Sequence, residues 1–138
     1  MQYYLAKTDP DTYSIDDFER DGVTIWDGVH NYAALIAIKA WRIGDRVLIY
    51  HSQGETTIAG VAEVIGEPYK DPHDARGISW VAKLKFIKKF SPDSRVTLKD
   101  IKTSSLFADF ALVKQGRLST MSCPKTFIDW LHEQGVNC

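Results

Sequence analysis

Three β-rich segments between residues 45 and 90 constrain the fold of this chain more than any other feature. DRVLIYHS (45–52) and IAGVAEVIG (58–66) are rich in β-branched residues and flank the short polar loop QGETT. Such a pattern predicts two strands paired as a hairpin. ISWVAKLKFIKKF (78–90) predicts a third, long strand that belongs to the same sheet.

The long strand shows the two-residue alternation of a sheet with one wet face. Its even positions carry Trp80, Ala82, Leu84 and Phe86, and its odd positions carry Lys83, Lys85 and Lys89. We therefore expect Trp80 on the buried or pocket side and the lysines in water. The lysine face is interpreted as a soluble strand surface and not as a binding stripe, because the formal net charge of the chain is −1.

Helices and turns separate the strands. QYYLAK (2–7) predicts a first strand, and Ser14 with Asp17 resembles a capping box for a short helix. The Trp-Asp-Gly tripeptide from residue 26 is interpreted as a turn that leads into a helix over 31–41. Asn31 is the expected N-cap of that helix, because its side-chain oxygen can accept from the first free N–H groups. Gly44 is its expected stop.

The second half of the sequence predicts shorter helices, a strand and a surface loop. EPYKDPHDARG (67–77) is a surface loop, VTLKDIK and SLFADFALVKQ are short helices, RLSTM (117–121) is a last strand, and CPKTFIDWLHEQG is an amphipathic helix. Short strands with helices inserted between them indicate an α+β protein with a small mixed or barrel-like sheet. The length of 138 residues fits one domain over 1–138.

Composition excludes several classes of protein. No apolar run reaches the roughly 20 residues that span a bilayer, and the first residues lack the pattern of a signal peptide. Two cysteines give no disulfide framework, which indicates a reducing compartment and a cytoplasmic location. The net charge of −1 argues against a broad basic surface for nucleic acid, although it leaves room for a local pocket.

Five segments in order resemble the EVE domain, a family of the PUA-like group that also contains the YTH and ASCH domains. They are YYLAKTDPDTYSIDDF, WDGVHNYAA, GDRVLIYHS, IAGVAEVIGEPYKDP and GRLS. The resemblance implies an α+β, PUA-like fold: a small, partly open mixed β-barrel with surrounding short helices. It also implies a pocket between the Trp-Asp-Gly segment and neighbouring strands that reads a modified base, especially a modified cytosine of DNA, without catalysis.

One segment departs from the family pattern. The family usually continues the Trp-Asp-Gly-Val motif with RNYQARN, whereas this chain has His30, Ala33, Leu35 and Ile36 at positions where the family has polar or cationic residues. The helix over 31–41 is therefore unusually apolar. A helix that is apolar on every side favours burial on every side, which predicts a weak homo-oligomer through this helix.

Ten residues are predicted to bind the base. Trp26, Tyr32 and Trp80 offer faces for stacking, worth about 1–3 kcal/mol per base. Asp27 and Asn31 offer base-edge acceptors and donors. The remaining candidates are His30, Ser52, Arg117, Leu118 and Ser119. Each has a plainer interpretation that stays open at this point: core aromatics, a capped helix, a turn serine and a solvated arginine. Trp41 and Trp130 are assigned to the core.

Catalysis receives little support. The histidines (His30, His51, His73 and His132) lack metal-ligand spacing, and the chain has no glycine-rich phosphate loop. Cys123 precedes a proline at a helix start but has no evident base nearby. We therefore expect no catalytic residue, metal or cofactor. The two remaining hypotheses are a non-catalytic module that captures a modified or flipped base of DNA or RNA, and a small-molecule or protein-interaction module on the same fold.

Overall fold

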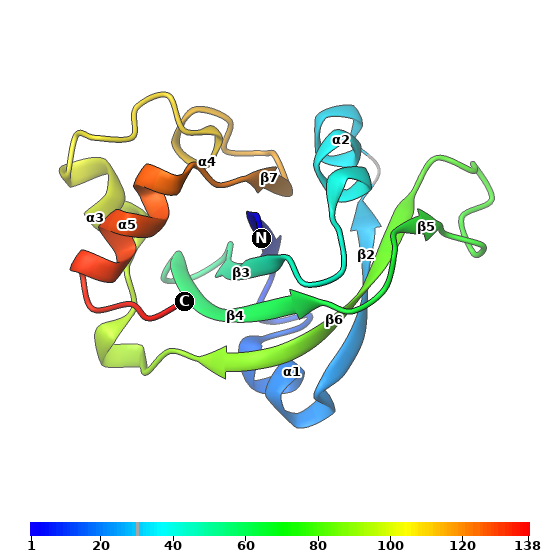
Figure 1. The fold of residues 1–138 in the computed structure, drawn as a ribbon, viewed down its shortest axis with the longest axis horizontal. Helices are drawn as coiled ribbons and strands as arrows, with labels where there is room; N and C mark the ends of the chain where they lie inside the picture. Colours follow the sequence, from blue (N-terminus) through cyan, green and yellow to red (C-terminus); the bar gives the residue numbers. More distant parts are fainter. Residues whose placement is uncertain (30) are drawn as a thin grey trace.

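The computed structural model describes residues 1–29 and 31–138 of the chain. Its strands are β1 (Tyr3–Thr8), β2 (Val23–Val29), β3 (Arg46–His51), β4 (Thr57–Val64), β5 (Tyr69–Lys70), β6 (Trp80–Lys89) and β7 (Thr120–Ser122). They form one mixed sheet in the order β2-β6-β4-β3-β1-β7, with the short β5 paired to β6. Figure 1 shows that this sheet is strongly curled.

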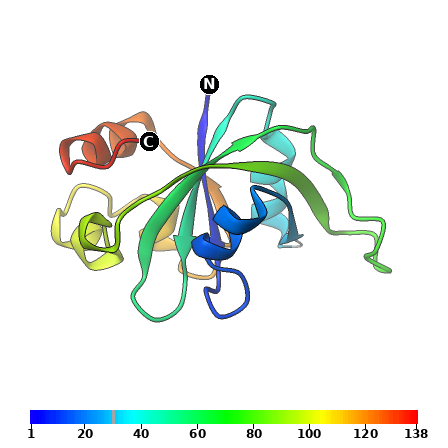
Figure 2. The ribbon, with the colours of Figure 1, turned by 90° about the horizontal axis from the view of Figure 1, so that it is seen from below.

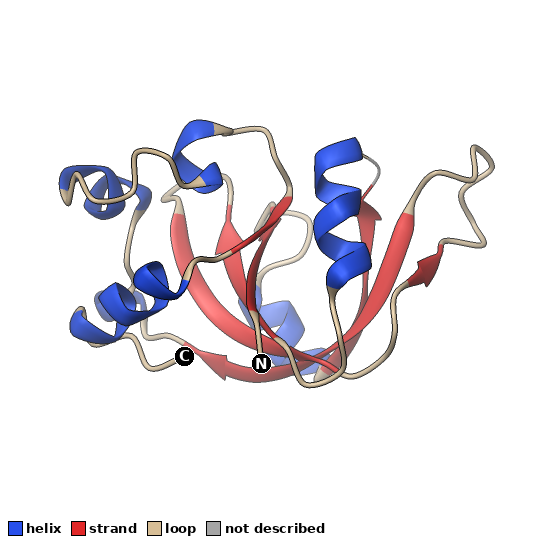
Figure 3. Cartoon of the chain, turned by 45° about the horizontal axis from the view of Figure 1, so that its top comes forward, coloured by secondary structure: helices blue, strands red, loops and turns tan. Residues whose placement is uncertain are grey.

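The helices are α1 (Ile15–Asp21), α2 (Tyr32–Ala40), α3 (Leu98–Thr103), α4 (Ala111–Lys114) and α5 (Lys125–Glu133), with a 3₁₀ turn at Pro92–Ser94. Helices α3, α4 and α5 gather at one end of the sheet, and the loop that carries β5 projects from the other end (Figure 3). Helix α1 packs against β6 and β2, and Figure 2 shows it lying across the sheet.

The first strand, β1, lies inside the sheet, as the last strand but one in the order. β1 pairs in parallel with β3 over its whole length and antiparallel with β7 on its other side. The sheet order therefore ends at β2 and β7, and α2 packs against both of these end strands and against β6. A helix thus bridges part of the gap between the two edges (Figure 1), and the barrel is partly open.

The local sequence patterns are confirmed by the structure. β3 and β4 pair as the predicted antiparallel hairpin. In β6, Ala82 and Leu84 are buried while Lys83 and Lys85 are exposed. The Ser14–Asp17 capping box is present, and Asn31 caps α2. These features depend on neighbours in sequence, which is why the sequence predicts them.

The Trp-Asp-Gly turn is a wrong prediction. This tripeptide lies inside β2, which pairs antiparallel with β6. The register shifts between Trp26 and Val29, so one extra residue is accommodated in a β-bulge, and Gly28 there has a φ of 75°. Only glycine adopts that backbone conformation at little cost, which explains a turn-like sequence within a strand.

Other boundaries also differ from the expectation: the last strand is Thr120–Ser122 and not 117–121, and the helix expected within SLFADFALVKQ is limited to Ala111–Lys114. α2 ends with Trp41 as its C-cap, whereas Gly44, the predicted stop, lies in the turn before β3 with a φ of 96°. The surface loop over 67–77 contains the two-residue strand β5. In addition, Lys89 is not simply in water, because its ammonium lies 3.0 Å from Asp16 and 3.5 Å from Glu19.

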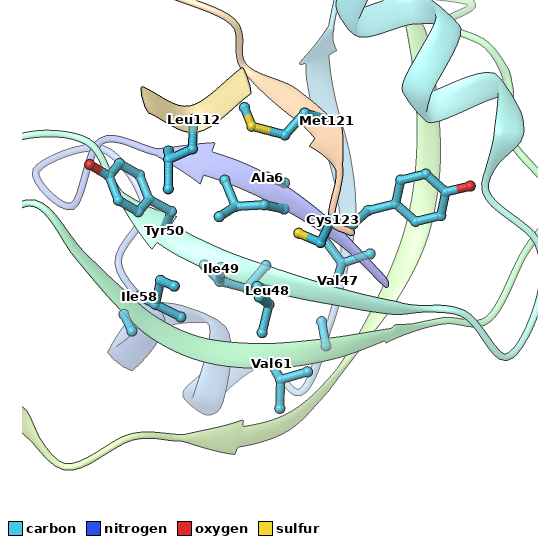
Figure 4. Close-up of a cluster of buried hydrophobic side chains, with 14 of the residues drawn as sticks. Ala6, Val47, Leu48, Ile49, Tyr50, Ile58, Val61, Leu112, Met121 and Cys123 are labelled. Atoms are coloured by element: carbon cyan, nitrogen blue, oxygen red, sulfur yellow. The ribbon is translucent and has the colours of Figure 1, made fainter. Parts of the chain in front are cut away.

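The core lies between the curled sheet and its helices. Figure 4 shows side chains of β1, β3, β4, β7 and α4 meeting there, among them Leu48, Ile49 and Leu112. Trp41 and Trp130 are buried, as predicted. Gly60 of β4 allows α1 to approach, because a Cβ at this position would lie 2.5 Å from the Ile15 side chain. α1 is thereby held directly against the sheet.

Candidate functional site

A cavity of about 320 Å³ opens where the curled sheet fails to close. Its lining comes from three segments: the end of β1, the loop that follows β1, and β2. We call it the seam cavity. Its lining residues are Lys7, Thr8, Thr12, Tyr13, Thr24, Ile25, Trp26 and Asp27. Cavities that hold small ligands start at about 300 Å³ and place a few polar groups on an apolar wall. The seam cavity has both properties.

The sheet topology explains why the cavity lies at this position. β7 pairs only with Tyr4, Leu5 and Ala6 of β1. The last main-chain contact between these segments is the Lys7 amide, which donates to the Ser119 oxygen at 2.8 Å. Beyond it, β1 has no strand partner on that side among residues 1–29 and 31–138, and β2 is the opposite end of the sheet. The seam cavity therefore lies between two strand edges.

Trp26 forms an inner wall of the seam cavity, not an open stacking face. The residue is only 7% exposed, and its ring lies 6.3 Å from that of Phe18 of α1 between centroids. Phe18 of α1 thus packs against this ring while the residue also lines the seam cavity, and its contact with a base stays a prediction. Asp27, the next residue, is exposed and also lines the cavity.

Lys7 is the basic side chain among the lining residues of the seam cavity. Its ammonium donates a hydrogen bond to the Gly116 oxygen at 2.8 Å and lies 5.8 Å from the centroid of the Tyr50 ring. Within residues 1–29 and 31–138, no carboxylate lies within ion-pair distance of it. Burial of this half-exposed side chain lowers the pKa of the Lys7 amine below its usual value.

Gly116, the partner of Lys7, belongs to a second cavity of about 310 Å³, which we call the flanking cavity. Its lining residues are Asn31, Gln115, Gly116, Arg117 and Leu118. The sequence predicted three of them as site residues, namely Asn31, Arg117 and Leu118, and the structure brings them together. The hydrogen bond from Lys7 to Gly116 connects the two cavities.

Asn31 already has a structural role. Its side-chain oxygen accepts from the amides of Ala33 at 3.0 Å and Ala34 at 3.4 Å, which is the predicted N-cap. The amide nitrogen of the same side chain is a further donor at the exposed start of α2. Capping and ligand contact are therefore compatible at this residue, and the contact itself stays a prediction.

Three predicted site residues, Trp80, Tyr32 and Ser52, lie outside the linings of both cavities. Trp80 lies under the Lys39 ammonium at 5.0 Å and lines neither cavity. Tyr32 is 81% exposed and also lines neither. Ser52 donates through its amide and hydroxyl to the Thr8 oxygen, and so orders the end of β1 from outside the lining. His30 lies outside the described residues.

Sequence reasoning missed the residues of β1 and its loop that line the seam cavity. Lys7, Thr8, Thr12 and Tyr13 belong to the segment KTDPDTY, a cluster of polar side chains directly after an apolar strand. That position is typical of binding residues, because a strand end is rigid and solvent-accessible. The polar cluster was therefore a usable signal. The contribution of β2 to the lining was not predicted, because the Trp-Asp-Gly tripeptide was interpreted as a turn and not as part of a strand.

Groups for catalysis or metal binding are sparse in the described chain. Within residues 1–29 and 31–138, no cluster of three or more His, Cys, Asp or Glu side chains could hold a metal ion. Burial raises the pKa of the Cys123 thiol far above its usual value, which disfavours a thiolate nucleophile. In the same residues, no helix has the length and apolar character required to cross a membrane.

Comparisons with known proteins agree on one family. The family model described as the EVE domain matches residues 2–134. Human thymocyte nuclear protein 1 is 32% identical over 81 residues, which cover 50% of this chain and 36% of that protein. The match thus spans little more than a third of this curated relative.

Solved structures extend the similarity to the whole fold. The structure of a Rhodopseudomonas palustris protein aligns with a TM-score of 0.87 and 34% identity, over 98% of this chain and 93% of the other. Human THYN1 protein, solved in complex with DNA containing 5-methylcytosine, aligns with a TM-score of 0.86 over 100% of both chains. At 21% identity the latter similarity concerns the fold alone. The predicted PUA-like, partly open mixed β-barrel is confirmed.

Proposed function

The chain belongs to the EVE domain family, and on that premise we propose that it is a non-catalytic binding module that captures one modified or flipped base of DNA or RNA. The observation that carries this proposal is the seam cavity, which holds Trp26 and Asp27 of the Trp-Asp-Gly motif together with Lys7 and three threonines. Its volume of about 320 Å³ suits one planar ring system and not a large cofactor.

The lining of the seam cavity offers the contacts that a base requires. The Asp27 carboxylate can accept from an exocyclic amine, and the Thr24 hydroxyl can donate or accept at the ring edge. The Thr8 hydroxyl donates to the Tyr13 oxygen at 2.7 Å and can accept from the ring edge. Trp26 supplies an apolar inner wall. The complex of human THYN1 protein with DNA containing 5-methylcytosine supports the choice of a modified cytosine as the first ligand to test.

The flanking cavity suits the adjoining nucleotide. Arg117 is exposed there and can donate two parallel hydrogen bonds to a phosphate group. Asn31 and Leu118 line the same cavity. The neighbouring Ser119 accepts a hydrogen bond from the Lys7 amide through its main-chain oxygen, and this bond holds the segment next to β1. Flipping a base out of a duplex costs a few kcal/mol, and contacts in both cavities would offset that cost.

The proposal is tested by Asp27→Asn in the presence of a short oligonucleotide with one 5-methylcytosine. Loss of a charge-assisted hydrogen bond is worth about 1.5–3 kcal/mol, so we expect binding roughly ten- to a hundredfold weaker by fluorescence anisotropy at low salt. Asp93→Asn is the matched control, since Asp93 is an exposed carboxylate of the Pro92–Ser94 turn, outside both cavities. Equal binding by both variants would remove Asp27 from the site.

One observation favours the second candidate function, a small-molecule or protein-interaction module without nucleic-acid binding. Tyr32 and Ile36 are 81% and 60% exposed on α2, beside the flanking cavity. Large apolar side chains at these exposed positions are suited to a protein or an apolar ligand. Absence of binding to methylated and unmethylated oligonucleotides at low salt, with an intact fold, would favour this candidate.

The cellular location of the protein and the extent of its domain belong to the same proposal. The two cysteines are both free, Cys123 buried and Cys138 half-buried, which supports a reducing cytoplasmic environment. We treat residues 1–138 as one EVE domain, because β1 near the start and β7 near the end pair with each other.

A further inference from the structure

We propose that Lys7 captures an aldehyde-bearing pyrimidine base as a reversible imine within the seam cavity. The inference rests on the proposed function for the nature of the ligand, since the base would bring the aldehyde to the amine. It goes beyond that function, because it adds a covalent and reversible step to binding. The ligand class is a pyrimidine with a formyl group on its ring.

The position of Lys7 is the first support. The residue lines the seam cavity together with Trp26 and Asp27, the two residues of β2 proposed to hold the base. Its ammonium has one hydrogen-bond acceptor in the described chain, the main-chain oxygen of Gly116 at 2.8 Å. A main-chain carbonyl holds the amine in place without the attraction of a full negative charge. The carbonyl thus orients the amine, and the amine can leave this hydrogen bond to react with a ligand.

The chemical state of Lys7 is the second support. Burial lowers the pKa of the Lys7 amine, so a larger fraction is neutral and nucleophilic near neutral pH than for an ordinary lysine. Lys89 shows the opposite situation. Its hydrogen bond and charge attraction to Asp16, with Glu19 nearby, raise its pKa and keep it protonated. Lys89 therefore serves as an internal control, a lysine that stays protonated and is expected not to form an imine.

The step balances without an oxidant or a reductant. The amine lone pair forms a nitrogen–carbon bond at the aldehyde carbon, and one of the two amine protons passes to the aldehyde oxygen to give a carbinolamine. The second amine proton then passes to the same oxygen, the carbon–oxygen bond breaks, water leaves and a carbon–nitrogen double bond remains. Water reverses both steps. The Thr24 hydroxyl and the Asp27 carboxylate line the same cavity and can relay the protons.

The experiment uses the full chain and an oligonucleotide with one 5-formylcytosine, in the presence of cyanoborohydride to reduce the imine to a stable amine. Peptide mapping by mass spectrometry locates the adduct and measures its rate at each lysine. We expect the adduct at Lys7 on the order of tenfold faster than at the exposed Lys83 and Lys85. An even distribution over the lysines, or no adduct, would overturn the inference.

Variants provide the controls. Lys7→Arg keeps a cation and a donor for the Gly116 oxygen but cannot form an imine, so it should lose the mapped adduct and retain its unfolding midpoint. Lys89→Arg should react like the unmodified chain. Loss of the adduct in both variants would overturn the assignment to Lys7. The mapping in the unmodified chain decides the question even if Lys7→Arg folds poorly.

Two further ligands separate this inference from the proposed function. An oligonucleotide with 5-methylcytosine cannot form an imine. If it binds while the formyl analogue gives no adduct at Lys7, imine capture fails and base capture stands. Pyridoxal is an aldehyde without a nucleic acid. If it modifies Lys7 selectively while neither oligonucleotide binds, the Lys7 amine is reactive, but the proposed function fails and the capture of a formylated base fails with it.

Discussion

The imidazole of His51 accepts a hydrogen bond from the main-chain amide of Ile15, with 3.1 Å between Nε2 and N. His51 is the last residue of β3, and Ile15 is the first of α1. The side chain of His51 is buried, so it satisfies one of the free N–H groups at the helix start. This contact ties α1 to the sheet, and α1 in turn covers Trp26 through Phe18.

Protonation of His51 should therefore weaken the fold. Burial lowers the pKa of His51, the charge of Arg95 lowers it further, and Asp16 opposes them. Because the unfolded histidine keeps a pKa of about 6.5, the unfolded chain binds the extra proton first. The contribution of His51 to stability is complete above about pH 6.5, falls as the pH drops below that value and stops falling below the folded pKa. Unfolding midpoints in urea between pH 7 and 5 measure this slope.

Two variants test the assignment to His51. His51→Gln retains a side-chain acceptor that does not titrate, and should show a flatter dependence of stability on pH. His73→Gln removes an exposed histidine of the projecting loop and should keep the original slope. Identical slopes for the two variants would show that the Ile15 contact does not govern the acid sensitivity.

Trp26→Ala should destabilise the chain as strongly as Trp130→Ala. The two rings are 7% and 9% exposed, and removal of a buried tryptophan costs about 3–5 kcal/mol. Denaturant unfolding with equal slopes measures both losses. A loss below about 1 kcal/mol for Trp26→Ala alone would mean that one face of the ring is open in solution, as the sequence predicted.

Nucleic-acid binding should depend only weakly on salt. The formal net charge is −1, and Arg117 is the one arginine that lines either cavity in the described chain. We expect a slope of log affinity against log salt that corresponds to about one to three phosphate contacts. Arg117→Ala should reduce that slope by about 0.7–0.9. Arg76→Ala, which removes a cation paired with Asp74 on the projecting loop, should leave it unchanged. A steep slope retained in Arg117→Ala would indicate the lysine face of β6 instead.

Self-association through α2 is a separate prediction. Ile36 and Tyr32 lie one turn apart on the exposed side of the helix, so they form one apolar strip. We expect a weak concentration-dependent increase in mass by sedimentation, and its loss in Ile36→Glu. Ile43→Glu is the control, since Ile43 is 61% exposed but lies beyond the helix. A mass that stays monomeric at every concentration would contradict the predicted homo-oligomer.

The sequence by itself determined the features that arise between near neighbours. The capping box of Ser14 and Asp17, the Asn31 cap, the β3–β4 hairpin and the alternation of β6 were all readable, because each depends on residues a few positions apart or on a strict period. The family resemblance predicted the partly open barrel, and it identified Trp26, Asp27 and Arg117 as candidate binding residues.

The tertiary structure alone decided where those residues meet. The parallel pairing of β1 with β3 joins segments more than 40 positions apart, and it leaves the end of β1 facing β2. Long-range pairing of this kind has no local signature, so the position of the seam cavity was not predictable from the sequence. The bulge at Gly28 and the burial of Trp26 under α1 have the same cause: backbone register and helix packing are set by partners that are distant in sequence.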